Sequence, residues 1–316
     1  MTEERYDVAI VGGGIAGLIT ANRLAQLGKR AIVLEQGREE RYLCNTRYTG
    51  GTFHVCLRDV MVEESTLKDA ICNATGGFVS EAWTDLIARE GRRVMRWLQA
   101  EGVRFIKVSP AEHHKWVLAP PGRNGPELDW QGRSGDVLLR TLEANLAQRG
   151  GTLVRDTRAD SLFIENGACR GVVAEHDGRN VRYHARAVVI ADGGFQANPE
   201  LVRSYICEIP EALQRRNAGT ARGDGLRMAL AVGARAVGTD RFYGHMLSRD
   251  AMTNDRLWPY PYLDNLATAG VVVDAKGDRF TDEGRGGVYI ANPIPKLPDP
   301  LAADVVFGSV IWEAAG

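Results

Sequence analysis

The sequence predicts an α/β fold in two domains, a larger one built on a parallel sheet and a smaller α+β one that follows it. A strand, a glycine-rich turn, a helix and a second strand follow one another directly over residues 6–35. Another apolar strand, predicted to be buried, covers residues 187–191 and runs into a pair of glycines. Because the composition changes after Gly238 in a chain of 316 residues, we expect domains at residues 1–238 and 239–316.

The composition is that of an ordinary globular protein and argues against several classes of function. Hydrophobic residues make up 44% of the chain and charged residues 25%, which argues against disorder and fibrous repeats. The 39 basic and 40 acidic side chains are interspersed, so we expect no nucleic-acid partner. No apolar stretch is long enough to span a membrane, and the acidic amino terminus leads directly into a strand, so we expect a cytoplasmic protein.

The cysteines argue against a disulfide or metal scaffold. Their number, five, is odd, and no two of them are spaced as Cys-x-x-Cys. We therefore expect no disulfide framework, no zinc or iron–sulfur centre, and no other metal site.

The first β-α-β unit carries the residues that a dinucleotide site needs. Gly12, Gly14 and Gly17 form the pattern G-x-G-x-x-G between the first strand and a helix that ends at Gly28. The first glycine permits the tight turn, the second lets the backbone approach a pyrophosphate, and the third lets helix and strand pack closely. The helix amino terminus offers N–H groups to the phosphates. Glu35 ends the second strand, where it is expected to bind ribose hydroxyls and to disfavour NADP.

The rest of the chain supplies the other predicted elements. A helix is expected at residues 81–101, with Trp83, Ile87 and Val94 among the apolar residues that should face the core. The other helices are expected at residues 136–148 and 226–234, and the other strands at residues 152–155, 181–183 and 269–273 and in a hairpin over residues 160–173 that turns at residues 165–167.

Three further segments resemble those of a known family. They are Asn45-Thr46-Arg47-Tyr48-Thr49-Gly50-Gly51, Ala191-Asp192-Gly193-Gly194-Phe195 and Gly219-Thr220-Ala221-Arg222-Gly223-Asp224-Gly225. With the first turn, they are similar in order and spacing to motifs of the fumarate reductase/succinate dehydrogenase flavoproteins, although Asp192 stands where that family usually has Thr. The resemblance implies a Rossmann-like FAD-binding domain with an inserted β-sheet at residues 1–238, and a smaller capping domain at residues 239–316.

The resemblance also implies FAD as the cofactor. The first turn by itself fits NAD equally well, so an NAD-dependent Rossmann oxidoreductase is the alternative from the residues alone. Covalently flavinylated family members have a histidine where this sequence has Cys44, so we expect non-covalent FAD. The residues expected to bind it are Gly12, Gly14, Ala16, Gly17, Glu35, Gln36, Asn45, Thr46, Gly50, Gly51, Ala159, Ala191, Asp192, Gly193 and Asp224.

The segment after Gly238 resembles the family's capping domain, in which a histidine and an arginine act on the substrate. Their counterparts by order and approximate spacing are His245 and Arg285. The resemblance implies that His245 binds a substrate carboxylate, that Arg285 handles the proton, and that Glu283 relays it. The residues alone also allow a hydrogen-bonded structural histidine, a solvated arginine, and a glutamate that pairs with Arg279.

The activity that the resemblance implies is that of an FAD-dependent oxidoreductase acting on CH–CH groups. A hydride passes between flavin N5 and a C–C bond of a di- or tricarboxylate, either tricarballylate-like or fumarate/succinate-like. A separate electron-transfer protein is the candidate partner that reoxidises the flavin. Because family members continue well past this length, we expect the carboxy-terminal part of the fold to be missing, and a non-catalytic flavin-binding fragment is a further alternative.

Overall fold

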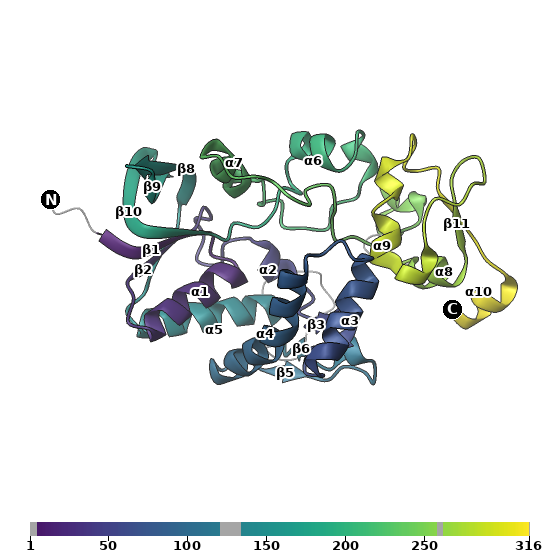
Figure 1. Cartoon of the computed structure of the whole chain (residues 1–316), viewed down its shortest axis with the longest axis horizontal. Coiled ribbons are helices and arrows are strands. Elements are labelled where there is room, and N and C mark those ends of the chain that lie inside the picture. Colours follow the sequence, from purple (N-terminus) through teal and green to yellow (C-terminus); the bar gives the residue numbers. More distant parts are fainter. Residues whose placement is uncertain (1–4, 121–133, 258–261, 316) are drawn as a thin grey trace. The chain divides into compact units, whose positions relative to one another are not determined.

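The structure, a computed structural model, describes residues 5–120, 134–257 and 262–315 (Figure 1). The chain divides into two compact units, each made of several separate segments. The first unit comprises Met1–His54, Arg93–Asn198 and Asn217–Ala236, and the second comprises Val55–Arg92, Pro199–Arg216 and Val237–Gly316. The second unit thus includes two segments that precede residue 238. The division into an FAD-binding domain at residues 1–238 and a capping domain at residues 239–316 stays a prediction.

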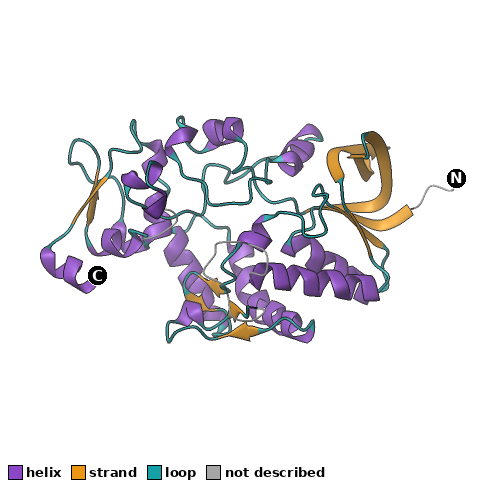
Figure 2. Ribbon diagram, turned by 180° about the vertical axis from the view of Figure 1, so that it is seen from behind, coloured by secondary structure: helices purple, strands orange, loops and turns teal. Residues whose placement is uncertain are grey.

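A six-stranded sheet in the order β7-β2-β1-β10-β9-β8 organises the first unit (Figure 2). Its strands are β1 (Arg5–Val11), β2 (Ala31–Leu34), β7 (Thr152–Val154), β8 (Thr157–Glu165), β9 (Ala168–His176) and β10 (Arg179–Ile190). Strands β7, β2, β1 and β10 are parallel neighbours, whereas β10, β9 and β8 are antiparallel. The predicted β-α-β unit and the predicted inserted strands therefore belong to one sheet.

Strand β10 joins the two halves of this sheet. The sequence predicts separate strands at residues 181–183 and 187–191, but the structure has one continuous strand. Its first half pairs antiparallel with β9, from Arg179 to His184, and its second half pairs parallel with β1, up to Ile190. Because both partners lie along one extended backbone, no turn is needed between the two predicted strands. The second half is only partly buried, contrary to the prediction.

The predicted hairpin between β8 and β9 is confirmed. Its turn consists of Asn166 and Gly167, which have φ angles of 52° and 73°. Two successive residues with positive φ give the turn whose twist matches that of the flanking strands. Asn and Gly are the residues that adopt this conformation at least cost.

The sheet of the first unit is covered on both faces, as the alternation of its side chains requires. The helices of this unit are α1 (Ile15–Gln26), α2 (Asn45–Tyr48), α5 (Ser134–Gln148) and α7 (Asp224–Ala231). On one face, Ile10 and Val33 pack in the same core as residues of α1 and α5. On the other face, Val11 packs in a core that includes residues of β8 and β9 and Met228 of α7. The carboxyl ends of β1, β2 and β10 therefore emerge at one edge between two apolar layers, which is the edge where such sheets bind ligands.

The remaining elements are mostly short. The helices are α3 (Glu64–Thr75), α4 (Glu81–Ala100), α6 (Pro199–Tyr205), α8 (Asp264–Ala269), α9 (Gly287–Ala291) and α10 (Ser309–Ala315). The strands are β3 (His54–Val55), β4 (Arg58–Asp59), β5 (Phe105–Ile106), β6 (Val117–Leu118), β11 (Val271–Val273) and β12 (Asp304–Val306). In the second unit, Met246, Ala267, Val272 and Ile290 form a core that joins α8, β11 and α9. Strand β11 begins later than predicted because residues 264–269 form α8.

Helix α4 differs from its prediction as a core helix. Its buried side carries Ala88, Met95 and Leu98. Trp83 is 62% exposed and Ile87 is 43% exposed, although both belong to the apolar face read from the sequence. The apolar face of this helix is wider than the part that other residues cover. The periodicity therefore predicted the helix correctly but predicted too wide a buried side.

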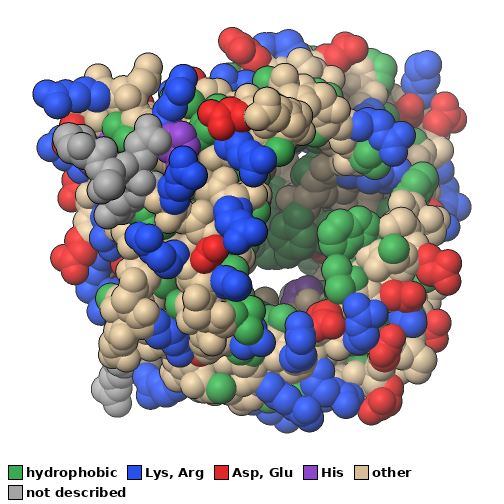
Figure 3. All heavy atoms as spheres, turned by 60° about the vertical axis from the view of Figure 1, so that its left-hand side comes forward, with side chains coloured by type: hydrophobic (Ala, Val, Ile, Leu, Met, Phe, Trp, Pro, Cys, Tyr) green, Lys and Arg blue, Asp and Glu red, His purple; other side chains and the backbone are tan. Residues whose placement is uncertain are grey.

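The surface carries charges of both signs. On the face that Figure 3 shows, Lys and Arg side chains lie among Asp and Glu side chains, in agreement with the balanced charge of the sequence. Of the helices that the structure describes, none is long and apolar enough to cross a membrane.

Candidate cofactor and substrate sites

A cleft in the first unit lies where β1, β2 and β10 end. It follows directly from the chain order, because Gly12 comes after β1, Glu35 after β2 and Ala191 after β10. Of the residues predicted to bind the cofactor, those that line the cleft are Gly12, Gly14, Ala16, Glu35, Gln36, Asn45, Thr46, Ala159, Ala191, Asp192, Gly193 and Asp224. The structure therefore brings together segments that lie far apart in the sequence, from Gly12 to Asp224.

The glycines of the first turn fit a dinucleotide for separate reasons. Gly12 has a φ of 100°, and a Cβ there would lie 2.6 Å from the carbonyl oxygen of Ala191. A Cβ on Gly17 would overlap the carbonyl oxygen of Gly12, which shows how closely α1 approaches the turn. A Cβ on Gly14 would meet only Thr46 Oγ1, at 3.4 Å. A side chain at Gly14 would therefore clash with no protein atom but would occupy space in the cleft. This is expected if a pyrophosphate approaches the backbone at Gly14.

Some backbone amides of this turn donate to protein acceptors, and others remain available to a ligand in the cleft. Glu35 Oε2 accepts from the Gly13 amide at 2.7 Å, and Thr46 Oγ1 accepts from the Ile15 amide at 3.0 Å. Within the described residues, no protein group accepts from the amides of Gly14 and Ala16. Two N–H groups at the amino terminus of α1 therefore remain for an anionic ligand.

Glu35 is a buried carboxylate with two backbone partners. Besides the Gly13 amide, it accepts from the Gly37 amide through Oε1, also at 2.7 Å. Burial raises the pKa of Glu35, and the two amide hydrogen bonds oppose that rise. The residue predicted to bind ribose thus also fixes the turn, and its oxygens each retain a second lone pair for a hydroxyl donor.

The segment that begins at Asn217 forms another wall of the cleft. Asn45 Oδ1 accepts from the Ala218 amide at 2.9 Å, and Gln36 Nε2 donates to the Thr220 carbonyl at 3.1 Å. Two residues predicted to bind the cofactor thereby tie this segment to α2 and to the end of β2. Three other glycines predicted to bind the cofactor, Gly17, Gly50 and Gly51, do not line the cleft. Gly17 lies in α1 under the turn, and Gly51 packs against Leu118.

Two aspartates hold the amino terminus of α7 at the cleft. Asp192 Oδ2 accepts from the Gly225 amide at 2.7 Å, so a carboxylate at this position compensates the helix dipole. Burial raises the pKa of Asp192. Burial also acts to raise the pKa of Asp224, but its ion pairs with Arg158, at 3.0 Å, and with Arg227 outweigh that effect and lower it. Asp224 therefore remains ionised beside the cleft.

The cysteine at the position of the family's flavin-linking histidine also lines the cleft. Burial is the main reason that the pKa of Cys44 is raised. A thiol with a raised pKa is a poor nucleophile at neutral pH, which is consistent with the expectation of non-covalent FAD.

A buried ionic network behind the turn was not predicted from the sequence. Arg47 is fully buried and donates to the Tyr42 carbonyl at 2.9 Å, to Asp136 at 3.3 Å and to Glu143 at 2.7 Å. The Tyr42 hydroxyl donates to the Gly13 carbonyl at 2.7 Å. Sequence reasoning had no signal for this network, because Arg47 and its partner Glu143 are 96 residues apart and an arginine is ordinarily exposed.

In the second unit, His245 forms a pair with Asp264. Its Nδ1 lies 2.5 Å from Asp264 Oδ2, and its Nε2 lies 3.1 Å from the Tyr243 hydroxyl. The imidazole stacks on the Tyr262 ring, with the centroids 4.2 Å apart. The carboxylate also packs against Gly287, where an added Cβ would overlap it. Asp264 is thus the partner of a predicted site residue, and the sequence analysis missed it because no motif singled it out.

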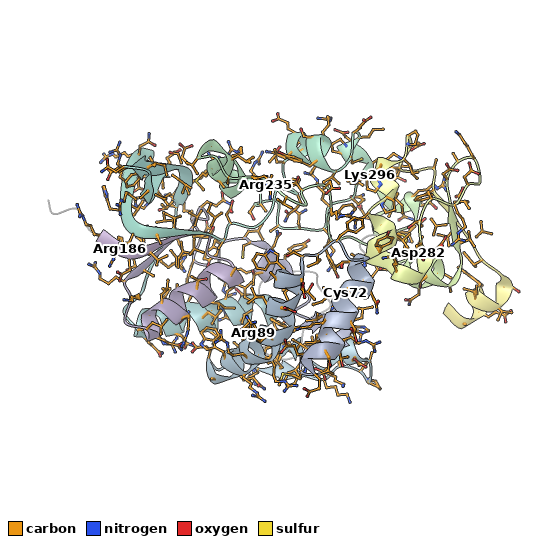
Figure 4. The ribbon with its side chains drawn as sticks, viewed as in Figure 1. Cys72, Arg89, Arg186, Arg235, Asp282 and Lys296 are labelled. Carbon is orange, nitrogen blue, oxygen red and sulfur yellow. The ribbon has the colours of Figure 1, made fainter. Side chains whose placement is uncertain are left out.

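Arg285 and Glu283 lie in the same unit, on the segment after β11. Arg285 Nε donates at 3.0 Å to the carboxylate of Asp282, which is labelled in Figure 4. Glu283 is buried, and it accepts from the Val272 amide at 2.7 Å and from Arg279 at 2.5 Å. The ion pair with Arg279 lowers the pKa of Glu283 to about 2, in spite of an opposite effect of burial. No contact recorded within the described residues joins Glu283 to Arg285.

A glycine turn at the ligand edge of an α/β sheet, with free helix-terminal amides, defines a domain that binds a nucleotide cofactor. One family model, described as FAD binding domain, matches residues 7–313. The chain belongs to this family, and its cofactor is FAD. The flavoprotein resemblance and the cofactor that the motifs predict are confirmed.

Relatives and solved structures extend this result. Vinyl phenol reductase of Lactiplantibacillus plantarum is 26% identical over 247 residues, which cover 75% of this chain and 47% of that protein. Urocanate reductase of Eggerthella lenta is 27% identical over 317 residues, covering 93% of this chain and 48% of that protein. The structure of 3-ketosteroid-Δ4-(5α)-dehydrogenase of Rhodococcus jostii RHA1 superimposes with a TM-score of 0.72 at 18% identity, covering 99% of this chain and 69% of that one. The predicted fold class is confirmed, and the chain spans about half the length of the curated relatives it matches.

Proposed function

We propose that this chain is the FAD-binding part of an oxidoreductase that acts on a C–C bond of a carboxylate-bearing substrate. The observation that carries the proposal is that two side chains able to bind a carboxylate lie in the second unit, His245 held by Asp264 and Arg285 held by Asp282. Bound FAD supplies hydride transfer at flavin N5, and the protein supplies binding and orientation.

The relatives support one class of reaction, but their substrates differ in chemistry. Urocanate carries a carboxylate, whereas vinyl phenol and 4-androstene-3,17-dione do not. Membership of the family therefore leaves the substrate open, and the side chains of this chain must decide it. A histidine and an arginine in one unit favour an anionic substrate, because both donate charge-assisted hydrogen bonds to carboxylate oxygens.

Each side chain has a separate part in this proposal. Asp264 orients the imidazole of His245 through Nδ1, so that Nε2, which also contacts the Tyr243 hydroxyl at 3.1 Å, can bind a substrate carboxylate. Asp282 orients the guanidinium of Arg285, whose planar fork matches a carboxylate and whose N–H groups can hold a proton at the reacting bond. Glu283 already has a partner for each oxygen, so we propose that it fixes the segment rather than relays the proton.

The finer proposal is a di- or tricarboxylate substrate. A histidine and an arginine can bind two carboxylates, and the proposal follows the resemblance of segments 45–51, 191–195 and 279–284 to those of tricarballylate dehydrogenase. A fumarate/succinate-like substrate satisfies the same chemistry. The same resemblance favours a separate electron-transfer protein as the partner that reoxidises the flavin.

The test is reoxidation of the reduced flavin by candidate acceptors without oxygen. The chain is loaded with FAD, reduced with dithionite and mixed with fumarate, cis-aconitate or urocanate while flavin absorbance is recorded. We expect an unsaturated carboxylate to restore the oxidised spectrum, and the corresponding saturated acid to leave the reduced flavin unchanged. Reoxidation by a vinyl phenol or a ketosteroid but by none of the carboxylates would contradict the proposal.

A further inference from the structure

One residue of the glycine turn, Gly13, is held through both its backbone N–H and its backbone carbonyl, which belong to two successive peptide groups. The Gly13 amide donates to Glu35, and the Gly13 carbonyl accepts from the Tyr42 hydroxyl, both at 2.7 Å. All of these groups are buried in the first unit. The Gly13 carbonyl and the Gly14 N–H form one planar peptide group, so the bond from Tyr42 orients the Gly14 amide, one of the two amides of the turn that have no acceptor in the described protein.

Tyr42 is itself fixed by two cations. The guanidinium of Arg47 lies 4.5 Å from the centre of its ring, and that of Arg155 lies 5.6 Å from it. Arg47 Nε also donates to the Tyr42 carbonyl. The side chain is 1% exposed, so its hydroxyl has few alternatives to the Gly13 carbonyl. A buried tyrosine hydroxyl with one partner is costly to leave unpaired.

Arg47 connects this contact to the opposite wall of the cleft. It belongs to α2, and its guanidinium is neutralised by Asp136 at 3.3 Å and Glu143 at 2.7 Å, both on α5. The neighbouring residue, Thr46, accepts from the Ile15 amide at the start of α1. One buried arginine thus holds the helix that caps the turn and the tyrosine that braces it.

We propose that Tyr42 and Arg47 are positioning residues for FAD: they fix the glycine turn in the conformation in which the Gly14 and Ala16 amides receive the pyrophosphate. Neither residue lines the cleft, so the proposal assigns both an effect on the turn rather than a contact with the cofactor. The inference rests on the cofactor assignment and is independent of the proposed substrate.

The physical reason is the flexibility of the turn. Three consecutive glycines lose more backbone freedom on ordering than any other tripeptide. A turn that is already ordered by the protein does not have to be ordered by the ligand, which raises affinity without any new contact. The hydroxyl of Tyr42 is the smallest group whose removal tests this effect, because Tyr42→Phe keeps the ring between its two guanidinium neighbours.

The experiment compares Tyr42→Phe with the matched control Tyr6→Phe. Tyr6 lies on β1 in the same unit, and its ring also lies near a guanidinium, that of Arg30. The measurements are the FAD dissociation constant by flavin fluorescence, the melting temperature of the apoprotein, and hydrogen–deuterium exchange over residues 11–18. The exchange measurement reads the conformation of the turn directly, without FAD or activity.

We expect Tyr42→Phe to weaken FAD binding by about tenfold and to speed exchange in the turn, while exchange in β8 and β9 and the apoprotein melting temperature match those of Tyr6→Phe. Unchanged FAD affinity, or unchanged exchange in the turn, would overturn the proposal. A loss of affinity that merely accompanies a general loss of stability would do so too. Arg47→Lys keeps a cation beside Asp136 and Glu143 but loses the donor to Tyr42, and it should change the exchange of the same peptide.

Discussion

The glycines at positions 14 and 17 are required for different physical reasons, and their substitution separates cofactor binding from folding. A Cβ on Gly17 overlaps the Gly12 carbonyl oxygen, whereas a Cβ on Gly14 has room in the protein and enters the cleft. We therefore expect Gly14→Val to fold normally and to emerge from purification colourless. Gly17→Val, the control, should lose several kcal/mol of stability, about 3 or more, because backbone must move. Chemical denaturation and the flavin spectrum distinguish the two; a yellow Gly14→Val protein would contradict the pyrophosphate assignment.

Glu283 gives the residue-scale prediction for pH. Its pKa is lowered to about 2 by Arg279, so its contribution to stability is complete above the unfolded value of 4.5 and disappears as the pH falls toward 2. At pH 7, Glu283→Gln should lose about 1–2 kcal/mol, because Gln can still accept from the Val272 amide but loses the charge-assisted bond to Arg279. Urea unfolding of both proteins at pH 7 and pH 3 should show the difference shrinking at the lower pH. An undiminished difference at pH 3 would show that the ion pair is not its source.

At this scale, the sequence predicted the residues that a motif marks and missed those that only the tertiary fold brings together. Gly12, Gly14 and Glu35 follow from local spacing, because a strand, a turn and a helix fix their positions. Tyr42 and Asp264 have no such spacing, because their side chains bond to partners elsewhere in the fold: Tyr42 to the Gly13 carbonyl, and Asp264 to His245 and the Met246 amide. Single-chain periodicity contains no information about such partners.

Helix α4 supplies a prediction at the scale of one element. Leu98 is fully buried, and Trp83 is 62% exposed, although the apolar pattern of the sequence includes both. Leu98→Ala should cost about 2–5 kcal/mol, as large-to-small changes in a core do. Trp83→Ala should change stability by less than about 0.5 kcal/mol, the usual range for surface positions. Equal losses in chemical denaturation would show that the exposed face is covered in solution.

The histidines beside β3 predict a pH dependence for that element. Burial lowers the pKa of His54, and the neighbouring His113 and His114 lower it further. A histidine whose folded pKa lies below its unfolded value of about 6.5 destabilises the folded state as the pH falls through that value. The chain should therefore be less stable at pH 5 than at pH 7.5, and His54→Gln should reduce that difference. Thermal unfolding of both proteins at the two pH values measures it, and an identical pH dependence would exclude His54 as a cause.

Strand β10 shows why element boundaries were harder to predict than element types. The residues between its two halves alternate poorly and include Arg186, so the sequence suggested a break. The backbone runs through because β9 and β1 are both available as partners, and strand pairing depends on such partners more than on local preference.

Across the whole molecule, the cofactor cleft belongs to one compact unit, and the histidine and arginine of the proposed substrate site belong to the other. Every residue that lines the cleft lies in the first unit, whereas His245, Asp264 and Arg285 lie in the second.

A ligand that binds only the folded protein stabilises it by about 2.7 kcal/mol at a hundredfold excess over the dissociation constant. We therefore expect saturating FAD to slow hydrogen exchange at residues 12–17 and 218–225 strongly, and at the core of the second unit, Ala267 and Val272, much less. Adenosine diphosphate, which lacks the flavin, is the control and should protect the glycine turn alone. Protection by FAD that is equal in both units would show that they unfold as one cooperative body, and protection confined to the second unit would refute the assignment of the cleft.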